Sequence, residues 1–348
     1  MGDQVLIGYS CWGFLGPGIL DTPDGGRSHR RTLIDGLRHT GHEILFLQRN
    51  RDLDEARNDL TEHYRWNIDL PDIDVLFLEW RWPIPGRNTT PCGRPGHTCD
   101  LHRQAELLTH YTHKLGIPTI IWDKDRQLDP HDPLRQLNHV TVCEPALHPS
   151  PGAVPLLFPV ADAAIDTASP AALAAHPRPT SLVYVGNQYD RDDAFDTFFA
   201  PAAAQLPHLI AGKWPETNRW PGLNFIDRVP FPQVTEIHTN ALATVLLLPD
   251  RYARVGQITQ RIFEAILAGC ATLLPTTIRS AAGLVPASLH VTDATDVRDR
   301  VGWLAEIAGT SNHADLIADC LRRLAPFRLS AQLDVLNRLL HRSDRVPS

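Results

Sequence analysis

The sequence predicts an α/β protein with two Rossmann-like domains, each built on a parallel sheet. Short apolar runs alternate with helical segments along the chain, and continuous apolar strands separated by helices are typical of parallel sheets that are covered on both faces. The alternation stops in a stretch rich in Pro and Ala over 144–180 and then starts again. The length of 348 residues fits two domains of ordinary size.

The first half of the pattern begins with an apolar strand over 5–9 and a glycine-rich loop that runs to Gly26. A helix over 28–40 follows, because Leu33, Ile34 and Leu37 share one helical face, and Gly41 ends it. The remaining elements predicted in this half are strands over 44–47, 73–78, 118–122 and 140–142, with a helix over 101–115 before the third of these strands.

The second half restarts with a strand over 182–186. It continues with helices over 191–204, 232–240 and 259–268 and with strands over 208–211, 224–226, 243–248, 271–274 and 289–291, and helices over 295–307, 313–325 and 330–342 close the chain. We therefore expect an N-terminal domain over 1–160, a second domain over 161–330, and a C-terminal helix in 331–348 that packs back on the first domain. Ligands of open parallel sheets bind at the carboxyl ends of the strands, so the predicted site is a cleft between the two domains.

The composition excludes several classes of protein. A net charge of −7, without visible clustering of positive charge, argues against nonspecific binding to nucleic acid. No run reaches the roughly 18 apolar residues of a membrane helix, and the first residues lack the pattern of a signal peptide. Six Cys with irregular spacing do not form a disulfide framework. We expect a cytoplasmic protein.

The most informative segment runs from Gly256 to Leu274 and predicts a helix, a glycine and a buried strand. Arg261 and Glu264 lie on one face of this helix, a spacing that also fits an ordinary amphipathic helix with a surface ion pair. The run Arg261-Ile-Phe-Glu-Ala-Ile-Leu-Ala-Gly269 resembles the R-x-F-E-a-x-a-x-G segment of GT-B glycosyltransferases, especially the CgeB-type and family-4-type enzymes. The segments 182–187 and 25–29 are similar to the glycine loops that open the two domains of those enzymes.

The resemblance implies metal-independent, retaining transfer of a sugar from a nucleotide-diphosphate sugar, with a UDP-sugar favoured and no further cofactor. In such enzymes the helix carboxylate that matches Glu264 accepts both ribose hydroxyls. Gly256 stands where many retaining members carry a second Glu, which leaves open the residue that faces the donor sugar. Arg191 is the predicted stabiliser of the leaving diphosphate, with Arg251 as a further candidate. The predicted donor-binding residues are Gly186, Asn187, Lys213, Arg254, Gln257, Ile258, Thr259, Arg261 and Glu264.

The first domain is expected to hold the acceptor. His29 at the helix entrance is a candidate base, and Asp123 is a candidate catalytic carboxylate. A capping or surface role for His29, and an aromatic plug in place of a sugar platform at 80–82, are the plainer interpretations. The predicted acceptor-binding residues are Gly16, Gly26, Arg27, Glu79, Trp80, Trp82 and Asp125.

Two short patterns could indicate a metal. Asp123-Lys124-Asp125 matches the D-x-D motif of GT-A glycosyltransferases, but the two-domain pattern argues against that fold. A second group, Cys92, His97, Cys99 and His102, has a spacing that matches no common zinc pattern. Zinc, an incidental loop and a Cys92–Cys99 disulfide all stay open for this group, and we predict no metal site.

The favoured acceptor is a small molecule of the natural-product or nucleoside type, and no membrane partner is expected. A cluster of Arg27, Arg30, Arg31 and Arg38 beside the first glycine loop keeps open transfer to a modified base in DNA, as some viral GT-B enzymes perform. Two more functions stay open on the same fold: a nucleotide-sugar epimerase, and a nucleotide-sugar binder without catalytic activity.

Overall fold

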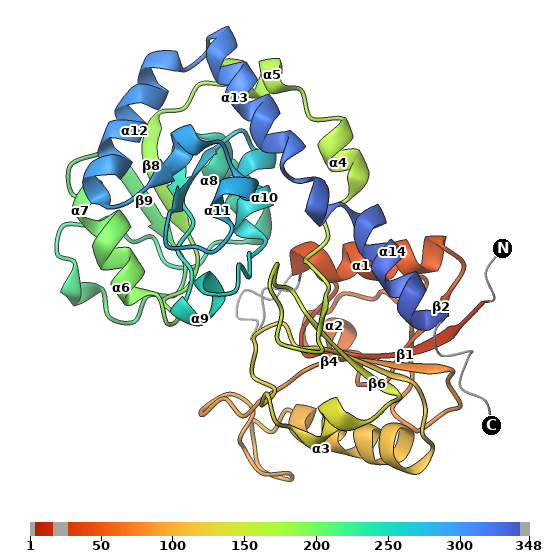
Figure 1. Cartoon of the computed structure of the whole chain (residues 1–348). Helices are drawn as coiled ribbons and strands as arrows, with labels where there is room; N and C mark the ends of the chain where they lie inside the picture. The colour runs from red at the N-terminus through yellow and green to blue at the C-terminus, as the bar shows by residue number, and fades with distance from the viewer. Residues whose placement is uncertain (1–3, 17–26, 342–348) are drawn as a thin grey trace. The chain divides into compact units, whose positions relative to one another are not determined.

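The computed structural model describes residues 4–16 and 27–341 of the chain. It contains a seven-stranded and a five-stranded sheet, and the strand pairs of both sheets are parallel (Figure 1). The predicted α/β class with two parallel sheets is confirmed. The chain divides into two compact units: unit 1 comprises Met1–Pro145, Pro149–Pro159 and Leu329–Ser348, and unit 2 comprises Ala146–His148 and Val160–Arg328.

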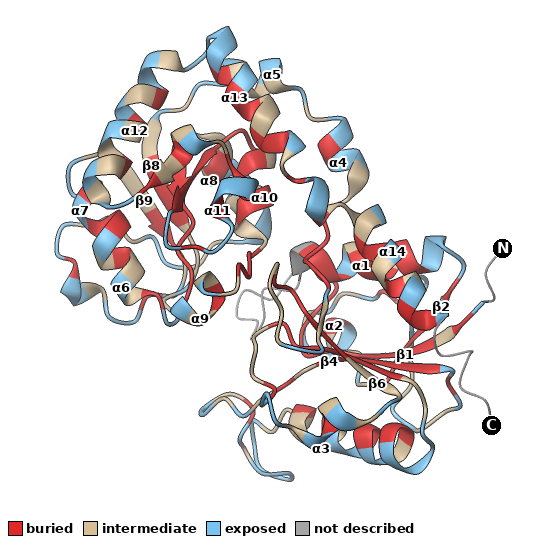
Figure 2. Cartoon of the chain, in the orientation of Figure 1, coloured by how far each residue is buried: buried red, intermediate tan, exposed pale blue. Residues whose placement is uncertain are grey.

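The sheet of unit 1 has the spatial order β3-β2-β1-β4-β5-β6-β7. Its central strands are buried on both faces, and β4 and β5 have no exposed residue (Figure 2). This is why their sequences are continuous apolar runs. The strands are β1 (Leu6–Ser10), β2 (Glu43–Phe46), β3 (Arg65–Trp66), β4 (Val75–Glu79), β5 (Thr119–Trp122), β6 (Val140–Glu144) and β7 (Val154–Pro155).

Helices cover both faces of this sheet (Figure 1). On one face lie α1 (Arg27–His39) and α14 (Leu329–Leu340), where a Cβ on Gly36 would lie 2.9 Å from Leu329 Cδ1. On the other face, α3 (Asp100–Leu107) continues as a π-helical segment, η1 (Leu108–Lys114), which buries Leu108 and Tyr111. The two short elements of unit 1 are α2 (Arg51–Asp54) and η2 (Pro133–Gln136).

The sheet of unit 2 has the order β12-β11-β10-β8-β9. Its strands are β8 (Thr180–Val185), β9 (His208–Ala211), β10 (Ala241–Val245), β11 (Ala271–Pro275) and β12 (His290–Val291). The helical elements are α4 (Asp162–Asp166), α5 (Pro170–Ala175), α6 (Asp192–Ala194), η3 (Phe195–Phe199), α7 (Ala200–Ala203), η4 (Thr217–Arg219), α8 (Phe231–Thr239), α9 (Asp250–Ala253), α10 (Arg261–Leu267), α11 (Ala281–Leu284), η5 (Ala287–Leu289), α12 (Ala294–Ile307), α13 (Ser311–Arg322) and η6 (Ala325–Phe327).

Three sequence predictions of local structure are wrong. The predicted strand over 224–226 makes only a single bridge, between Phe225 and Ile210. The predicted helix over 191–204 is divided into α6, the π-helical η3 and α7, because Pro201 lacks an N–H and its ring disturbs the preceding turn. The Pro- and Ala-rich stretch over 144–180, in which the sequence pattern predicts no helix or strand beyond its ends, contains β7, α4 and α5.

Among the helices that the structure describes, none combines the length and the hydropathy that a bilayer crossing requires.

Candidate functional site

Unit 2 offers a binding position where its strand order reverses. From β8 the sheet extends to β9 on one side and to β10, β11 and β12 on the other. In open parallel sheets, ligands bind outside the carboxyl ends of the strands at such a switch point. The loops 186–191 and 246–260, which follow β8 and β10, together with α10, form what we call the unit 2 switch point.

Gly186 follows β8 and packs against α10. Its N–H donates to the carbonyl oxygen of Ala211 at 2.8 Å, and a Cβ at this position would lie 2.7 Å from Arg261 Nε. Gly212 makes the neighbouring loop equally tight, because its φ is +141° and a Cβ there would lie 2.2 Å from the carbonyl oxygen of Gly186. The backbones of Gly186 and Gly212 and the guanidinium of Arg261 are therefore packed so closely that a Cβ fits at neither glycine.

Two guanidinium groups meet at the ring of Tyr184. Arg261 donates from Nε to the carbonyl oxygen of Val185 at 2.9 Å and lies 5.9 Å from the Tyr184 ring centre. The buried Arg191 donates to the Tyr184 hydroxyl and to the carbonyl oxygen of Tyr189. Burial lowers the pKa of Arg261; Tyr184 opposes this shift, and the charge of Arg191 adds to it. Because the oxygens that receive these bonds are neutral, the pair brings positive charge to the carboxyl end of β8, which suits an anion.

Other predicted cations of unit 2 lie further out. Asn187 and Lys213 are exposed, and Asn187 Oδ1 accepts from the Lys213 backbone N–H at 2.9 Å. Arg251 is 2.5 Å from a carboxylate oxygen of Asp190, in the loop after β8. The side chain of Arg254 is 77% exposed and pairs with an exposed aspartate four residues earlier. Arg254 is therefore a solvated surface charge.

The residues before and within α10 divide between core and surface. Ile258 is 1% exposed, so its side chain belongs to the core and cannot contact a ligand. Gln257 is also buried, and its backbone forms a bridge with Ala146. Thr259 Oγ1 accepts from Arg261 Nη1 at 3.3 Å. Glu264 is half-buried, one turn into the helix.

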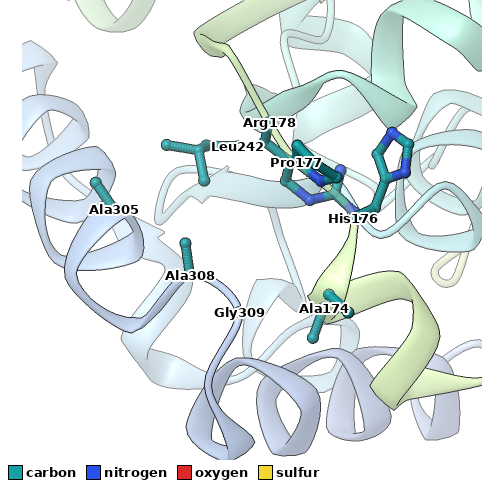
Figure 3. A pocket seen from close by; sticks show the side chains of 9 residues that line it. Ala174, His176, Pro177, Arg178, Leu242, Ala305, Ala308 and Gly309 are labelled. Atoms are coloured by element: carbon teal, nitrogen blue, oxygen red, sulfur yellow. The ribbon is translucent and has the colours of Figure 1, made fainter.

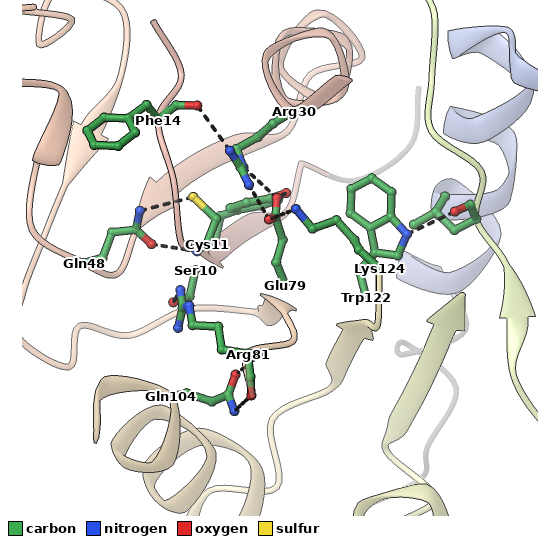
Figure 4. A network of polar contacts seen from close by, with 12 residues as sticks. Ser10, Cys11, Phe14, Arg30, Gln48, Glu79, Arg81, Gln104, Trp122 and Lys124 are labelled. Atoms are coloured by element: carbon green, nitrogen blue, oxygen red, sulfur yellow. Dashed lines mark hydrogen bonds and ion pairs between the residues drawn. The ribbon is translucent and has the colours of Figure 1, made fainter. Parts of the chain in front are cut away.

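Unit 1 has a corresponding switch point between β1 and β4, and a buried charge network occupies it (Figure 4). Glu79, the last residue of β4, accepts from the Tyr9 hydroxyl at 2.6 Å. Its two carboxylate oxygens also accept from Arg30 Nε at 2.8 Å and Nη2 at 2.6 Å. Lys124 Nζ lies 2.5 Å from Glu79 Oε2. With four donors on two oxygens, the predicted acceptor-binding residue Glu79 is fully used inside the protein, and we correct its role to a structural one.

The network is held ionised by its own charges. Burial alone would raise the pKa of Glu79, but Arg30 and Lys124 outweigh this effect and hold the pKa well below its ordinary value. Burial and the Glu79 charge raise the pKa of Tyr9, so its hydroxyl stays a donor. Glu79 is thus the carboxylate that pairs with two buried positive groups, Arg30 and Lys124, at the carboxyl end of β4.

A third cation lies at the same edge of the sheet. Arg81 is 2% exposed and donates from Nη2 to Ser10 Oγ at 2.9 Å. The side-chain amide of Gln104 holds the Arg81 backbone at both its N–H and its carbonyl, at 2.8 and 2.9 Å. The buried Arg81 Nε has no hydrogen-bond partner. Figure 4 shows Arg81 approaching the end of β1 from the side of α3.

The structure also moves both predicted catalytic residues of the first domain into the interior. His29 is 2% exposed and packs on the rings of Trp122 and Phe158, at centroid distances of 5.5 and 4.3 Å. Asp123 is 0% exposed, and its two oxygens accept the backbone N–H groups of Gln127 and Leu128. Burial raises the pKa of Asp123 to about 6. We correct both roles: His29 packs the core and Asp123 holds a turn.

The structure describes the remaining predicted acceptor-binding residues to different extents. The Gly16 N–H donates to Asp52 Oδ1 at 2.8 Å, so its backbone is already bound by the protein. Gly26 lies outside the described residues, and of Arg27 only the backbone, in α1, is described. Asp125 is half-buried, two residues after Asp123 and three after the end of β5.

The two tryptophans after β4 differ in their surroundings. Trp80 is half-buried and packs against the core cluster of unit 1, and its indole N–H has no hydrogen-bond partner. Trp82 is half-buried, and its carbonyl oxygen accepts from the Asn88 side chain at 2.9 Å. Trp80 therefore fits the interpretation as an aromatic plug, and Trp82 stays the candidate for a stacking surface.

A hollow of about 330 Å³ lies elsewhere on unit 2 (Figure 3). Its lining includes Arg178 just before β8 and Leu242 near the start of β10. It is thus at the amino ends of the strands, where an open parallel sheet does not bind its ligand. Arg178 donates there to carbonyl oxygens of Leu173, His238, Thr239, Ala241 and Ala268, which makes it a structural clamp.

Comparison with known proteins adds the fold relationship. No protein-family model and no curated protein matches the sequence. Among solved structures, phage T4 BGT in complex with UDP and Mn²⁺ aligns over 96% of this chain and 99% of its own, with 13% identity and a TM-score of 0.65. The avilamycin-biosynthesis glycosyltransferase AviGT4 aligns over 97% and 98%, with 14% identity and a TM-score of 0.58. Anabaena HepE in complex with UDP-glucose aligns over 97% and 100%, with 10% identity and a TM-score of 0.56.

The chain has the GT-B fold. The fold resemblance predicted from the run Arg261 to Gly269 is therefore confirmed. Sequence reasoning missed Tyr184 and considered Arg30 only as a member of an arginine cluster, although the two switch points are organised around these residues. Both look like ordinary members of a strand and of a charged helix, and only the three-dimensional fold places them against Arg191 and Glu79.

Proposed function

We propose that this protein is a glycosyltransferase that moves a sugar from a UDP-sugar to a small-molecule acceptor of the natural-product or nucleoside type. The observation that carries the proposal is the pair Arg191 and Arg261 beside Gly186, at the switch point of a GT-B fold. Solved proteins with this fold include complexes with UDP and with UDP-glucose. On this proposal unit 2 is the donor domain and unit 1 is the acceptor domain.

The diphosphate is the part of the donor that this site suits best. Arg191 and Arg261 present guanidinium groups whose present acceptors are neutral oxygens. Phosphate oxygens are stronger acceptors for such groups. Lys213 and Arg251, in the neighbouring loops, supply further positive charge as negative charge develops on the leaving diphosphate. We propose that Glu264 accepts from the ribose, and that these cations make a metal ion unnecessary for departure of the nucleotide.

The resemblance of Arg261 to Gly269 to the family-4-type segment supports a retaining outcome. On the acceptor side, Asp125 and Trp82 are the proposed contacts, since Glu79 and Asp123 are already bound within unit 1. The unpaired state of all six cysteines supports a reducing, cytoplasmic location.

Transfer to a base in DNA is the second candidate function, because one aligned structure is that of a DNA-modifying β-glucosyltransferase. Three of the four arginines that kept this function open are paired with carboxylates in the structure. Arg30 is buried on Glu79, and the side chains of Arg31 and Arg38 share the carboxylate of Asp35. With a net charge of −7, the chain fits a small acceptor better.

The first test is a thermal-shift series with UDP, GDP, ADP, CDP and dTDP, each with EDTA, Mg²⁺ or Mn²⁺. A ligand at about 100 times its Kd adds about 2.7 kcal/mol of stability. We expect UDP to give the largest shift, with or without a metal. A shift that requires Mg²⁺ or Mn²⁺ would refute metal independence, and no shift with any nucleotide would refute the donor assignment.

The second test follows the sugar. Incubation with radiolabelled UDP-glucose and separate pools of small aglycones and of modified-base DNA should label the small-molecule pool. Label in the DNA would overturn the acceptor assignment. Binding of UDP with no release of UDP from any UDP-sugar, across both pools, would leave a non-catalytic binder as the function.

A further inference from the structure

Beyond the sugar-transfer site, the long connection in unit 1 between β4 and α3 gathers three ligand-type side chains. Residues 80–99 contain no helix or strand, although they join two regular elements (Figure 1). Connections longer than about 12–15 residues with no structure of their own are uncommon in compact domains. Such long connections are usually either functional or linker segments.

Cys92 and Cys99, from the second half of this connection, meet His102 in the first turn of α3. One ligand atom from each of the three residues lies within 4.8 Å of the other two, and Cys99 Sγ is 4.0 Å from His102 Nδ1. Ligands held at about 2.0–2.3 Å by a tetrahedral zinc ion lie roughly 3.3–3.8 Å apart. The three side chains are thus within a small rotamer adjustment of a shared metal.

The backbone supports the same arrangement. Cys99 has φ +63°, a left-handed conformation that is unfavourable for a residue with a Cβ. Backbone bonds from Arg94 to Pro91 and from His97 to Arg94 form the successive turns that return the chain from Cys92 to Cys99. The C-x-x-H spacing then places Cys99 and His102 on one side of the start of α3.

A second histidine of the same loop has an open ligand atom. His97 Nδ1 is 2.7 Å from the carbonyl oxygen of Thr90, which accepts a hydrogen bond only if Nδ1 carries the proton. The lone pair is then on Nε2, and this atom is buried and has no hydrogen-bond partner. His97 is not one of the three residues whose ligand atoms lie within 4.8 Å of one another, so it is not a proposed ligand.

We propose that Cys92, Cys99 and His102 bind one Zn²⁺ ion, with the fourth position taken by water. Two thiolates and an imidazole bind zinc in preference to the hard cations Mg²⁺ and Ca²⁺, which prefer oxygen ligands. The ion would join the outer part of the connection to α3. The same first turns of α3 hold Arg81, through the Asp100 carbonyl oxygen at 3.5 Å and the Gln104 side chain, so the site is a staple for the β4–α3 edge of unit 1.

The test uses the full chain without a histidine tag, reduced and freed of metal by a chelator. Zinc is then titrated in competition with a chromophoric chelator, with no nucleotide present. We expect one equivalent to bind, and Cys92→Ser, Cys99→Ser and His102→Ala each to weaken it at least about 100-fold, the upper end of what outer-shell partners of a metal cost. The exposed His113, at the far end of the same helical segment, gives the matched control: His113→Ala should bind like the unmodified chain.

Two further readouts separate a metal site from a structural loop. Cobalt in place of zinc should give thiolate-to-metal charge-transfer absorption that the Cys92→Ser/Cys99→Ser variant lacks. Zinc should also raise the Tm of the unmodified chain and leave that of the double variant unchanged. The proposal is overturned if the unmodified chain binds no zinc, if the double variant binds it as tightly, or if the reduced chain, once freed of reductant in the absence of air, has lost two thiols to a Cys92–Cys99 disulfide. None of these outcomes bears on UDP binding.

Discussion

Gly269 lies directly against the guanidinium of Arg178: a Cβ at Gly269 would be 2.3 Å from Arg178 Nη2, and the glycine has φ +72°. The last residue of the run that begins at Arg261 is therefore fixed by a packing requirement. Arg178 in turn donates to carbonyl oxygens at the ends of α5, α8 and α10. Helix carboxyl ends carry unsatisfied carbonyls and partial negative charge, which a buried cation satisfies.

From this arrangement we expect Arg178→Met to destabilise unit 2 without changing its ligand specificity. Several charge-assisted bonds are lost at once, each worth about 1.5–3 kcal/mol, so the total should exceed about 3 kcal/mol. Thermal unfolding measures the loss, and Arg254→Met, at an exposed arginine, should cost less than about 1 kcal/mol. UDP affinity measured below the unfolding transition should be unchanged; a lower affinity would mean that Arg178 influences the opposite end of the sheet.

Gly186→Ala should disturb the switch point of unit 2. The added Cβ would lie 2.7 Å from Arg261 Nε and 2.8 Å from the Tyr184 hydroxyl oxygen, so the guanidinium must move. We expect a lower Tm and UDP binding weakened about 10-fold or more, read by calorimetry. Gly302 in α12 is the control, because a Cβ there has nothing within 4 Å. Gly302→Ala should stabilise the helix by about 0.5–1 kcal/mol and leave UDP binding as it was.

Glu79→Gln should be among the most costly single substitutions in unit 1. It removes the carboxylate charge that pairs with the buried side chains of Arg30 and Lys124, and breaking a buried ion pair typically costs about 3–5 kcal/mol. Glu43→Gln, at an exposed pair with Arg65, should cost about 0–1 kcal/mol. Thermal or urea unfolding distinguishes them. Equal costs for the two substitutions would contradict the view that the network at the end of β4 holds unit 1 together.

The pKa of Asp123 gives a pH dependence with a definite sign. Its folded pKa is about 6, above the ordinary value of 3.8, because burial penalises the charged form. The carboxyl thus contributes stability that is fully present below about pH 4 and is lost as the pH rises through about 6. Asp123→Asn removes this titration.

The measurement is the difference in Tm between the Asp123→Asn variant and the unmodified chain, taken from pH 4.5 to pH 7. The Tm of the variant should rise relative to that of the unmodified chain as the pH increases across that interval. The altered bond to the Leu128 N–H adds a constant cost that does not depend on pH. A difference that stays flat with pH would show that Asp123 titrates normally. Glu79 cannot mimic the effect, because its depressed pKa removes stability as the pH falls below about 4.5.

Much of the fold could be predicted because local patterns and packing agree. β4, β5 and β10 are buried along their whole length, so their sequences are continuous apolar runs with a single interpretation. The helix over 191–204 could not be placed correctly, because Pro201 acts on the turn before it. Phe225 reads as a strand residue, yet it packs in an aromatic cluster with Phe195, Trp214 and Trp220.

The site was harder to predict than the fold, for a different physical reason. A sequence shows that Asp123 and Glu79 end strands, but not whether a neighbour has already taken their oxygens. Their partners come from the backbone four and five residues further along and from α1, 49 residues earlier. Gly186 and Arg261 were predicted because each belongs to a recognisable segment, whereas Tyr184 carries no local signal at all.

The last prediction concerns Arg191 and Arg261, the two positive side chains at the carboxyl end of β8. Arg191→Gln should weaken UDP binding about 10- to 100-fold, because it removes a charged donor worth about 1.5–3 kcal/mol from the site proposed for the diphosphate. Uridine has no phosphate, so its affinity should change little. Calorimetry with both ligands therefore separates loss of charge from collapse of the site, which would weaken both equally. Arg254→Gln is the matched control, since that side chain is 77% exposed and should leave both affinities unchanged. If Arg254→Gln weakened UDP binding as much as Arg191→Gln, the diphosphate would lie at the outer rim of α9 and not beside Tyr184.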